Sequence, residues 1–165
     1  MRLLITGATG FIGKALIVEL VRQNFNVSIA VRYKTNLFTD KVKQFVVGDF
    51  GDNPDFSTSL AKVDCIIHLA GKAHVIDKDK TSVLDEFRKI NTELTLSLAK
   101  QAITAGSKRF IFLSSIGVNG NQTDVPFLET DTPNPQESYA LSKYEAEQGL
   151  LKLAKNRNLE VVIIR

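Results

Sequence analysis

The sequence contains few of the residues that build disulfides and metal sites. Its single cysteine, Cys65, lies inside the apolar run at residues 63–69, and we interpret it as a small core residue of a reducing compartment. The two histidines, His68 and His74, are too few for a convincing metal centre, so no bound metal is expected. Long hydrophobic stretches are missing as well, because no apolar run approaches the roughly 18 residues that a membrane span needs.

A strong charge of either sign is also absent. The net charge is +3, and no run of lysine or arginine is long enough for a nucleic-acid footprint, so we expect no nucleic-acid partner. No secretion signal precedes the first strand pattern, and we expect a cytoplasmic protein without a membrane partner. The 165 residues, 44% of them hydrophobic and 24% charged, suit one globular domain. The charged residues 77–80 are expected to be solvated surface.

Apolar runs typical of strands alternate with helical patterns along the chain. The expected strands are residues 2–6, 27–31, 44–47, 63–69, 110–113 and 161–164. Amphipathic spacing predicts helices at residues 11–23, 87–105 and 138–155. Such alternation is typical of α/β proteins, in which helices cover both faces of a parallel sheet. We therefore predict a Rossmann-type, doubly wound parallel sheet in a three-layer α/β/α arrangement.

A glycine-rich segment joins the first strand to the first helix. Its sequence is TGATGFIG at residues 6–13, with glycines at Gly7, Gly10 and Gly13. Small residues there allow a tight turn, let the backbone approach a pyrophosphate and let the helix pack close to the sheet. The helix N-terminus adds free N–H groups and a partial positive charge. An ordinary turn between strand and helix is the alternative, but this position along the chain favours a dinucleotide loop.

The end of the second strand bears on the choice of cofactor. An acidic residue there would bind the adenosine 2′-hydroxyl and favour NAD. The sequence reads AVRYK at residues 30–34 instead, so Arg32 and Lys34 could meet a 2′-phosphate or could simply be solvated turn residues. Asp49 follows the next strand, where it could contact the adenine amine or serve as a plain turn aspartate.

Tyr139, Lys143 and Ser115 form the candidate catalytic set. Tyr139 and Lys143 are four residues apart, so they share one face of the predicted helix. A nearby ammonium and a positive nicotinamide ring would lower the pKa of the phenol and make it a usable general base. Ser115 ends the fifth strand, at the edge where doubly wound sheets bind ligands. A Tyr-x-x-x-Lys spacing alone would be read as a surface pair, but its place after Ser115 and after a loop with three prolines makes it much more specific.

The sequence resembles the extended short-chain dehydrogenase/reductase family, and within it the nucleotide-sugar epimerases of the UDP-galactose/UDP-glucose 4-epimerase type. The resemblance is carried by Asn91 and by TGATGFIG at 6–13, VVGDF at 46–50, HLAGKAH at 68–74, FIFLSSIGVNG at 110–120 and YALSK at 139–143. It implies that Asp49 meets adenine and that Asn91 supports the active-site helix or a water near the lysine. The implied catalytic residues are Ser115, Tyr139 and Lys143. The implied cofactor-binding residues are Gly7, Thr9, Gly10, Phe11, Ile12, Gly13, Arg32, Asp49, Phe50, Leu69, Ala70, Gly71, Asn91, Tyr139 and Lys143.

The same resemblance implies an enzyme that uses NAD or NADP on a nucleoside-diphosphate sugar. A 4-epimerase is expected first, with Tyr139 as acid and base. An NADPH-dependent 4-keto sugar reductase is the alternative, and a non-catalytic dinucleotide sensor is a third reading. Ile116 and Gly117 stand where the family's 4,6-dehydratases carry an Asp-Glu pair, which argues against dehydration. The family's substrate domain lies largely beyond residue 165, so the chain is expected to be an incomplete fragment. A homodimer is among the assemblies expected.

Overall fold

The computed structural model describes residues 1–74, 80–155 and 157–165. Its centre is a six-stranded parallel sheet with the order β3-β2-β1-β4-β5-β6, which confirms the predicted doubly wound fold. The strands are β1 (Arg2–Thr6), β2 (Asn26–Val31), β3 (Lys43–Val46), β4 (Cys65–His68), β5 (Arg109–Leu113) and β6 (Glu160–Ile164). The helices are α1 (Phe11–Arg22), α2 (Ser57–Leu60), α3 (Lys80–Phe87), α4 (Leu94–Thr104) and α5 (Ser138–Ala154). The charged run at 77–80, expected to be surface, falls largely outside the described residues.

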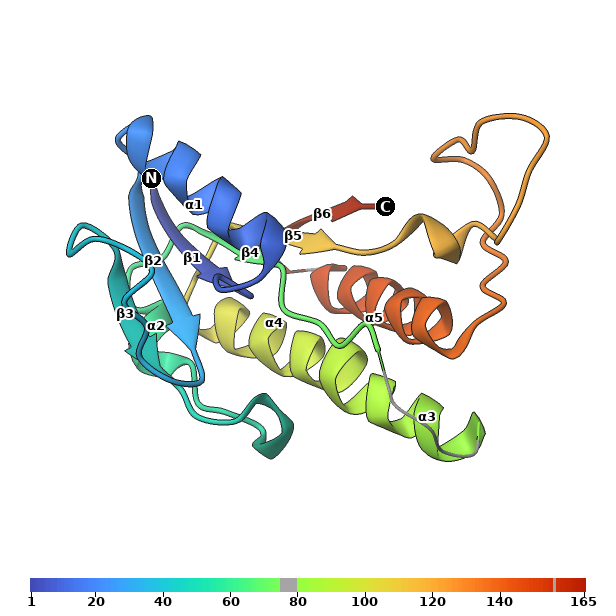
Figure 1. Cartoon of the computed structure of the whole chain (residues 1–165), viewed down its shortest axis with the longest axis horizontal. Helices are drawn as coiled ribbons and strands as arrows, with labels where there is room; N and C mark the ends of the chain where they lie inside the picture. The colour runs from blue at the N-terminus through green and yellow to red at the C-terminus, as the bar shows by residue number, and fades with distance from the viewer. Residues whose placement is uncertain (75–79, 156) are drawn as a thin grey trace.

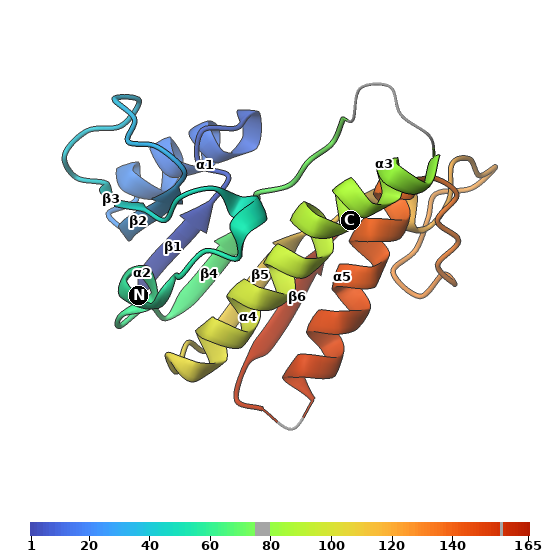
Figure 2. The same cartoon turned by 90° about the horizontal axis from the view of Figure 1, so that it is seen from below.

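Helices lie on both faces of the sheet and bury two separate apolar cores (Figure 1). Alternate side chains of one strand serve the two cores, as the pleat of a strand requires. Leu3 and Ile5 of β1 pack with Ile17 of α1, whereas Leu4 belongs to the core under α2, α4 and α5. Figure 2 shows α4 and α5 side by side across this second face. The result is the expected three-layer arrangement.

The long predicted helix at 87–105 differs from the structure. Helical structure begins earlier, at Lys80, and the segment Arg88–Glu93 between α3 and α4 is π-helical. There the backbone N–H of Leu94 bonds to the carbonyl of Lys89, five residues earlier. A π segment keeps the helical apolar pattern on either side, so periodicity alone could not reveal it. The four-residue helix α2 was also missed, because one turn is too short to show a period.

The fold brings two loops together at the carboxyl ends of neighbouring strands. β1 pairs with β4, and the sheet continues from β1 toward β2 and from β4 toward β5. The loops after β1 and β4 therefore meet where the strand order reverses, the position at which such sheets bind ligands. Among the described residues, no helix has both the length and the apolar character needed to cross a membrane.

Candidate dinucleotide and catalytic site

The glycine-rich loop is folded tightly against its surroundings. Gly7 has φ of +69°, and a Cβ there would lie 2.6 Å from the backbone nitrogen of Ala70. A Cβ on Gly13 would lie 2.3 Å from the carbonyl oxygen of Gly7, so this glycine lets α1 pack onto the loop. Gly10 is different, since its Cβ would meet only the Gly7 oxygen, at 3.2 Å. Two glycines are thus required by the fold itself, while Gly10 stands at the surface of the loop.

The loop forms one wall of a cavity of about 710 Å³. The cavity runs between the glycine-rich loop, the end of β2 and the loop after β4. At the loop, α1 begins at Phe11 with no side-chain cap at Gly10, so its first N–H groups are available to an anion. This cradle fits the pyrophosphate of a dinucleotide. The lining residues are Gly7, Ala8, Thr9, Gly10, Ala30, Val31, Arg32, Tyr33, Lys34, Thr35, Asp49, Phe50, Leu69, Ala70, Gly71, Lys72 and Ile90.

Most residues predicted to bind the cofactor line this cavity, but six do not. Phe11, which is 94% exposed, and Ile12 project from the start of α1, while Gly13 is buried beneath the loop. Asn91 and Lys143 lie beyond the lining, next to Gly71, and Tyr139 lies one helical turn before Lys143 at the start of α5. Sequence reasoning missed the lining residues Ala8, Ala30, Val31, Tyr33, Thr35, Lys72 and Ile90.

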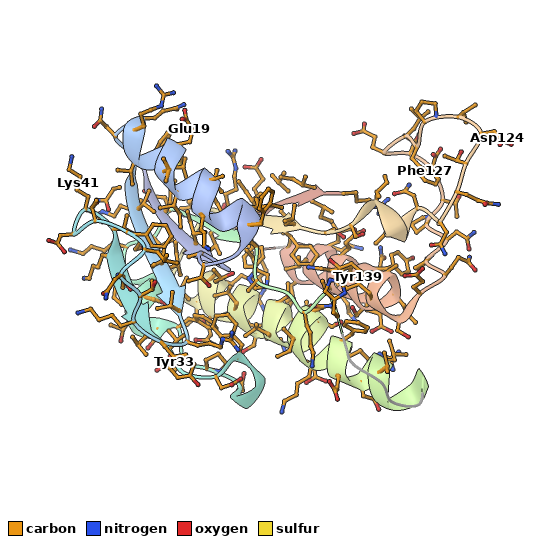
Figure 3. All side chains as sticks on the ribbon, in the orientation of Figure 1. Glu19, Tyr33, Lys41, Asp124, Phe127 and Tyr139 are labelled. Carbon is orange, nitrogen blue, oxygen red and sulfur yellow. The ribbon has the colours of Figure 1, made fainter. Side chains whose placement is uncertain are left out.

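The far end of the cavity carries the polar residues that follow β2 and β3. Arg32, Tyr33 and Lys34 are all exposed there, and Figure 3 shows Tyr33 well separated from Tyr139. The Asp49 carboxylate accepts a hydrogen bond of 2.9 Å from the backbone N–H of Gly51 and caps the 3₁₀ turn Phe50–Asp52. Asp49 is therefore both a turn residue and part of the cavity wall.

Ser115, Tyr139 and Lys143 gather where β5 meets the start of α5. Ser115 accepts a hydrogen bond of 3.2 Å from Gly117 and starts the 3₁₀ turn Ile116–Val118, which packs against α5. Lys143 is only 3% exposed, and its Nζ donates to the Leu113 carbonyl at 3.0 Å. The same Nζ lies 6.0 Å from the centre of the Tyr139 ring. The structure thus brings the three predicted residues to one end of the sheet.

Gly71 connects this cluster to the cavity. A Cβ on Gly71 would lie 3.1 Å from Lys143 Nζ and 3.3 Å from Asn91 Oδ1. Since Gly71 also lines the cavity, a molecule that extends from the glycine-rich loop past Gly71 would reach Lys143 and then Tyr139. Absence of a side chain at this position keeps the passage open.

Burial dominates the electrostatics of the cluster. It lowers the pKa of Lys143 to about 8, while the charge of Glu147 acts in the opposite direction. It also raises the pKa of the Tyr139 phenol above its usual value. Burial is the cause of this rise, and Lys143 Nζ is held at the Leu113 carbonyl, 6.0 Å from the centre of the phenol ring. The lowered pKa expected from the sequence concerns the site with a positive nicotinamide ring as well as the ammonium, and it stays a prediction.

Asn91 joins the loop after β4 to the active-site helix. Its Oδ1 accepts from the Lys72 N–H at 2.8 Å, and its Nδ2 donates to the Lys72 carbonyl and to Ser142 Oγ, each at 3.0 Å. Ser142 Oγ in turn donates to the Tyr139 carbonyl at 2.7 Å. The three hydrogen bonds of the Asn91 amide thus all hold the loop after β4 against α5, which fits the expected support of α5.

A second buried network starts at His68, which ends β4 and is fully buried. The His68 ring contacts the rings of Phe110 and Phe112 and hydrogen-bonds Thr6 and Thr95. Burial lowers the pKa of the imidazole to about 3, so the ring is neutral at ordinary pH. Sequence patterns gave no sign of these partners, which lie on other strands and helices.

Comparisons with known proteins agree with this geometry. A family model described as the NAD dependent epimerase/dehydratase family matches residues 3–165. A UDP-glucose 4-epimerase of Vibrio cholerae is 45% identical over 166 residues, covering 99% of this chain and 50% of the relative. A human dTDP-D-glucose 4,6-dehydratase is 33% identical over 177 residues, covering 99% of this chain and 50% of the relative. The chain spans about half the length of the curated relatives it matches.

Solved structures give the same result. MoeE5 in complex with UDP-glucose and NAD has a TM-score of 0.85 at 27% identity, covering 100% of this chain and 54% of the other. The UDP-glucose 4-epimerase of Thermotoga maritima with UDP-glucose has a TM-score of 0.85 at 26% identity, with 100% and 55% covered. Since the family model matches nearly every residue, the chain belongs to the NAD dependent epimerase/dehydratase family.

Proposed function

We propose that the protein containing these residues is an NAD(P)-dependent nucleotide-sugar 4-epimerase. The observation that carries the proposal is the alignment of the glycine-rich loop, Gly71, Lys143 and Tyr139 along one path at the carboxyl end of the sheet. The names of the most similar relatives support it, since the Vibrio cholerae relative is a UDP-glucose 4-epimerase. Two similar structures also hold UDP-glucose, one of them together with NAD.

In this proposal the loop residues Gly7, Thr9 and Gly10 hold the pyrophosphate, and Asp49 faces the adenine. A nicotinamide cofactor, when bound, would supply the hydride acceptor and donor for the sugar C4. Tyr139 removes the proton of the sugar O4 hydroxyl and gives it back at the end of the reaction. Lys143 provides a positive charge that favours the Tyr139 phenolate, and Ser115 donates a hydrogen bond to the same sugar oxygen.

Product stereochemistry tests the reaction directly. The complete gene product that contains these residues would be incubated with UDP-glucose, UDP-galactose and their GDP and dTDP counterparts. We expect the C4 epimer in the NMR spectrum, with no net change in NAD(P)H absorbance. If the protein binds NAD but converts none of these sugar nucleotides, the enzyme proposal is wrong and the non-catalytic sensor is favoured.

One observation favours a second candidate, an NADPH-dependent 4-keto sugar reductase. β2 ends at Val31, and the exposed cations Arg32 and Lys34 line the cavity in place of the acid that an NAD site would carry. A reductase would consume NADPH, with Tyr139 giving a proton to the ketone oxygen. Net loss of NADPH absorbance with a 4-keto sugar nucleotide would identify it.

The remaining expectations are parts of the same proposal. We propose that these residues form the NAD(P)-binding domain and that the sugar is held mainly by additional sequence, because the relatives are about twice as long. Near-attack placement of the sugar needs that second part, so the 165 residues alone are expected to bind cofactor with little turnover. Cytoplasmic location, a homodimer and the absence of nucleic-acid partners stay predictions.

A further inference from the structure

One acidic side chain in the core takes no part in the mechanism above. Glu147 of α5 has 0% exposure, although carboxylates are rarely buried without partners. Its Oε1 accepts a short hydrogen bond from Ser114 Oγ. Arg165 donates from Nη2 to Oε2 at 2.6 Å and from Nε to both carboxylate oxygens at 3.1 and 3.2 Å. The carboxylate is therefore fully engaged.

These contacts tie three elements together at the carboxyl end of the sheet. Ser114 directly follows β5, Arg165 directly follows β6, and Glu147 is on α5. Arg165 also donates from Nη1 to Asn119 Oδ1 at 3.1 Å, which extends the network to the residue after the 3₁₀ turn Ile116–Val118. The carboxylate thus fixes how far α5 lies from the ends of both strands.

The position of Glu147 in sequence links this network to the candidate catalytic residues. Ser114 is the neighbour of Ser115, and Glu147 is one helical turn after Lys143. A shift of Glu147 relative to Ser114 would therefore move Lys143 and Tyr139 relative to Ser115. Positions of reacting groups matter at this scale, since a misplacement of about 1 Å can cost on the order of 100-fold in rate.

Glu147 also provides negative charge near a buried cation. Among the described residues, Lys143 forms no ion pair with a carboxylate, and its ammonium contacts the Leu113 carbonyl and the Phe112 ring. The charged and titratable groups on the elements around Lys143 are Tyr139 and Glu147 of α5, the neutral His68 of β4, Arg165 after β6, and the pairs Lys72–Glu86 and Arg88–Glu145. Of these, Glu147 is the group whose charge raises the pKa of Lys143.

We propose that Glu147 is a positioning residue of the active site, which holds Ser115 opposite Tyr139 through Ser114 and acts as the distant counter-charge of the Lys143 ammonium. The proposal rests on the proposed function for its effect on turnover, but its effect on Lys143 is independent of the reaction. It adds a buried carboxylate to a site whose contacting residues are Ser115, Tyr139 and Lys143.

Glu147→Gln in the complete gene product is the main test. The glutamine amide keeps the shape of the side chain and can still accept a hydrogen bond from Ser114. The negative charge is lost, so Arg165 no longer has a carboxylate partner. The pKa of Lys143 should fall further, because the negative charge that raises it is gone. The alkaline limb of the pH–rate profile, and the pH above which NAD affinity declines, should therefore both move to lower pH. Glu145→Gln is the matched control, because this half-buried acid on the same helix pairs with Arg88 instead.

Two further variants keep the test decisive if Glu147→Gln folds poorly. Ser114→Ala removes the contact to β5 but keeps the charge, so kcat should fall about tenfold or more while the alkaline limb stays in place. Arg165→Lys keeps the positive charge but loses the two-pronged guanidinium contact with Glu147. We expect the same fall in kcat and the same unmoved alkaline limb. An unmoved limb and unchanged kcat in all three variants would overturn the proposal.

NAD titration separates this proposal from the proposed function. If the parent converts no sugar nucleotide, yet Glu147→Gln shifts the pH dependence of NAD binding and Glu145→Gln does not, the reaction is wrong and the role of Glu147 stands. Suppose instead that the parent proves to be an active epimerase. If Glu147→Gln then leaves the pH dependence of both NAD affinity and rate unchanged, the proposed role of Glu147 is wrong.

Discussion

Thr6 Oγ1 and His68 Nδ1 lie 2.6 Å apart inside the core, and the threonine is the donor. The direction follows from the other side of the ring. Thr95 Oγ1 donates to the Asn91 carbonyl at 2.7 Å, so it can only accept the hydrogen bond of 2.9 Å that it shares with His68 Nε2. His68 is thus neutral with its proton on Nε2. The chain of bonds connects β1, which carries the glycine-rich loop, to the π segment that carries Asn91.

Acid should therefore weaken the fold through His68. With a pKa of about 3 in the folded state against 6.5 in the unfolded state, the unfolded chain binds more protons between these values. The contribution of His68 to stability is complete above pH 6.5 and is lost as the pH falls, at up to about 1.4 kcal/mol per pH unit. Denaturant unfolding of the parent between pH 4 and 7 would measure it. His68→Gln should be less stable than the parent at pH 7, but its free energy of unfolding should depend less on pH. His74→Gln, at an exposed position, should show the same dependence of unfolding free energy on pH as the parent.

Substitutions in the glycine-rich loop should separate binding from folding. Gly10→Val places its side chain where the pyrophosphate is proposed to lie, with only the Gly7 oxygen nearby at 3.2 Å, so the fold should survive a cost of about 1 kcal/mol. NAD affinity should fall by at least about tenfold in calorimetric titration. Gly13→Val should instead fail to fold stably, since its Cβ would overlap the Gly7 carbonyl. Unchanged NAD affinity in a folded Gly10→Val variant would refute the placement of the phosphates.

Tyr139→Phe should abolish proton transfer while leaving the fold intact. The ring would keep its edge contact with Phe87, whose centre lies 5.7 Å away. Positioned acid–base groups contribute roughly 100- to 10,000-fold, and the loss in kcat should fall in that range. Steady-state kinetics of the complete gene product, with NAD binding as the control, would measure it. More than about a tenth of the parent's activity would mean that another residue is the base.

Arg32 should decide how well a 2′-phosphate is tolerated. We expect the parent to bind NADP modestly more tightly than NAD, because Arg32 and Lys34 line that end of the cavity. Arg32→Ala should reduce NADP affinity about tenfold, as expected for the loss of one charge-assisted hydrogen bond, and should change NAD affinity little. Titration of both cofactors into both proteins tests this. Equal losses for the two cofactors, or tighter binding of NAD by the parent, would show that the 2′-position lies elsewhere.

The sequence was informative where function and fold depend on local patterns. The strands, the glycine-rich loop and the spacing of Tyr139 and Lys143 are all local, and the structure has them nearly as expected. Glu147 shows why other features were missed. In sequence it is one acid among the polar residues of a helix, and only the sheet brings Ser114 and Arg165 to it. Burial of the Tyr139 phenol, which raises its pKa, was missed for a related reason, since burial depends on packing that no spacing reveals.

The π segment Arg88–Glu93 has a consequence for how the chain tolerates deletions. One helical residue turns the chain by about 100°, so deleting one residue here to restore a regular helix would swing everything before it around the axis. Phe87 would then leave Tyr139, while Leu94 and Thr95 would keep their places. A one-residue deletion in this stretch would therefore cost this chain either the contact between Phe87 and Tyr139 or the hydrogen bonds between Asn91 and Lys72.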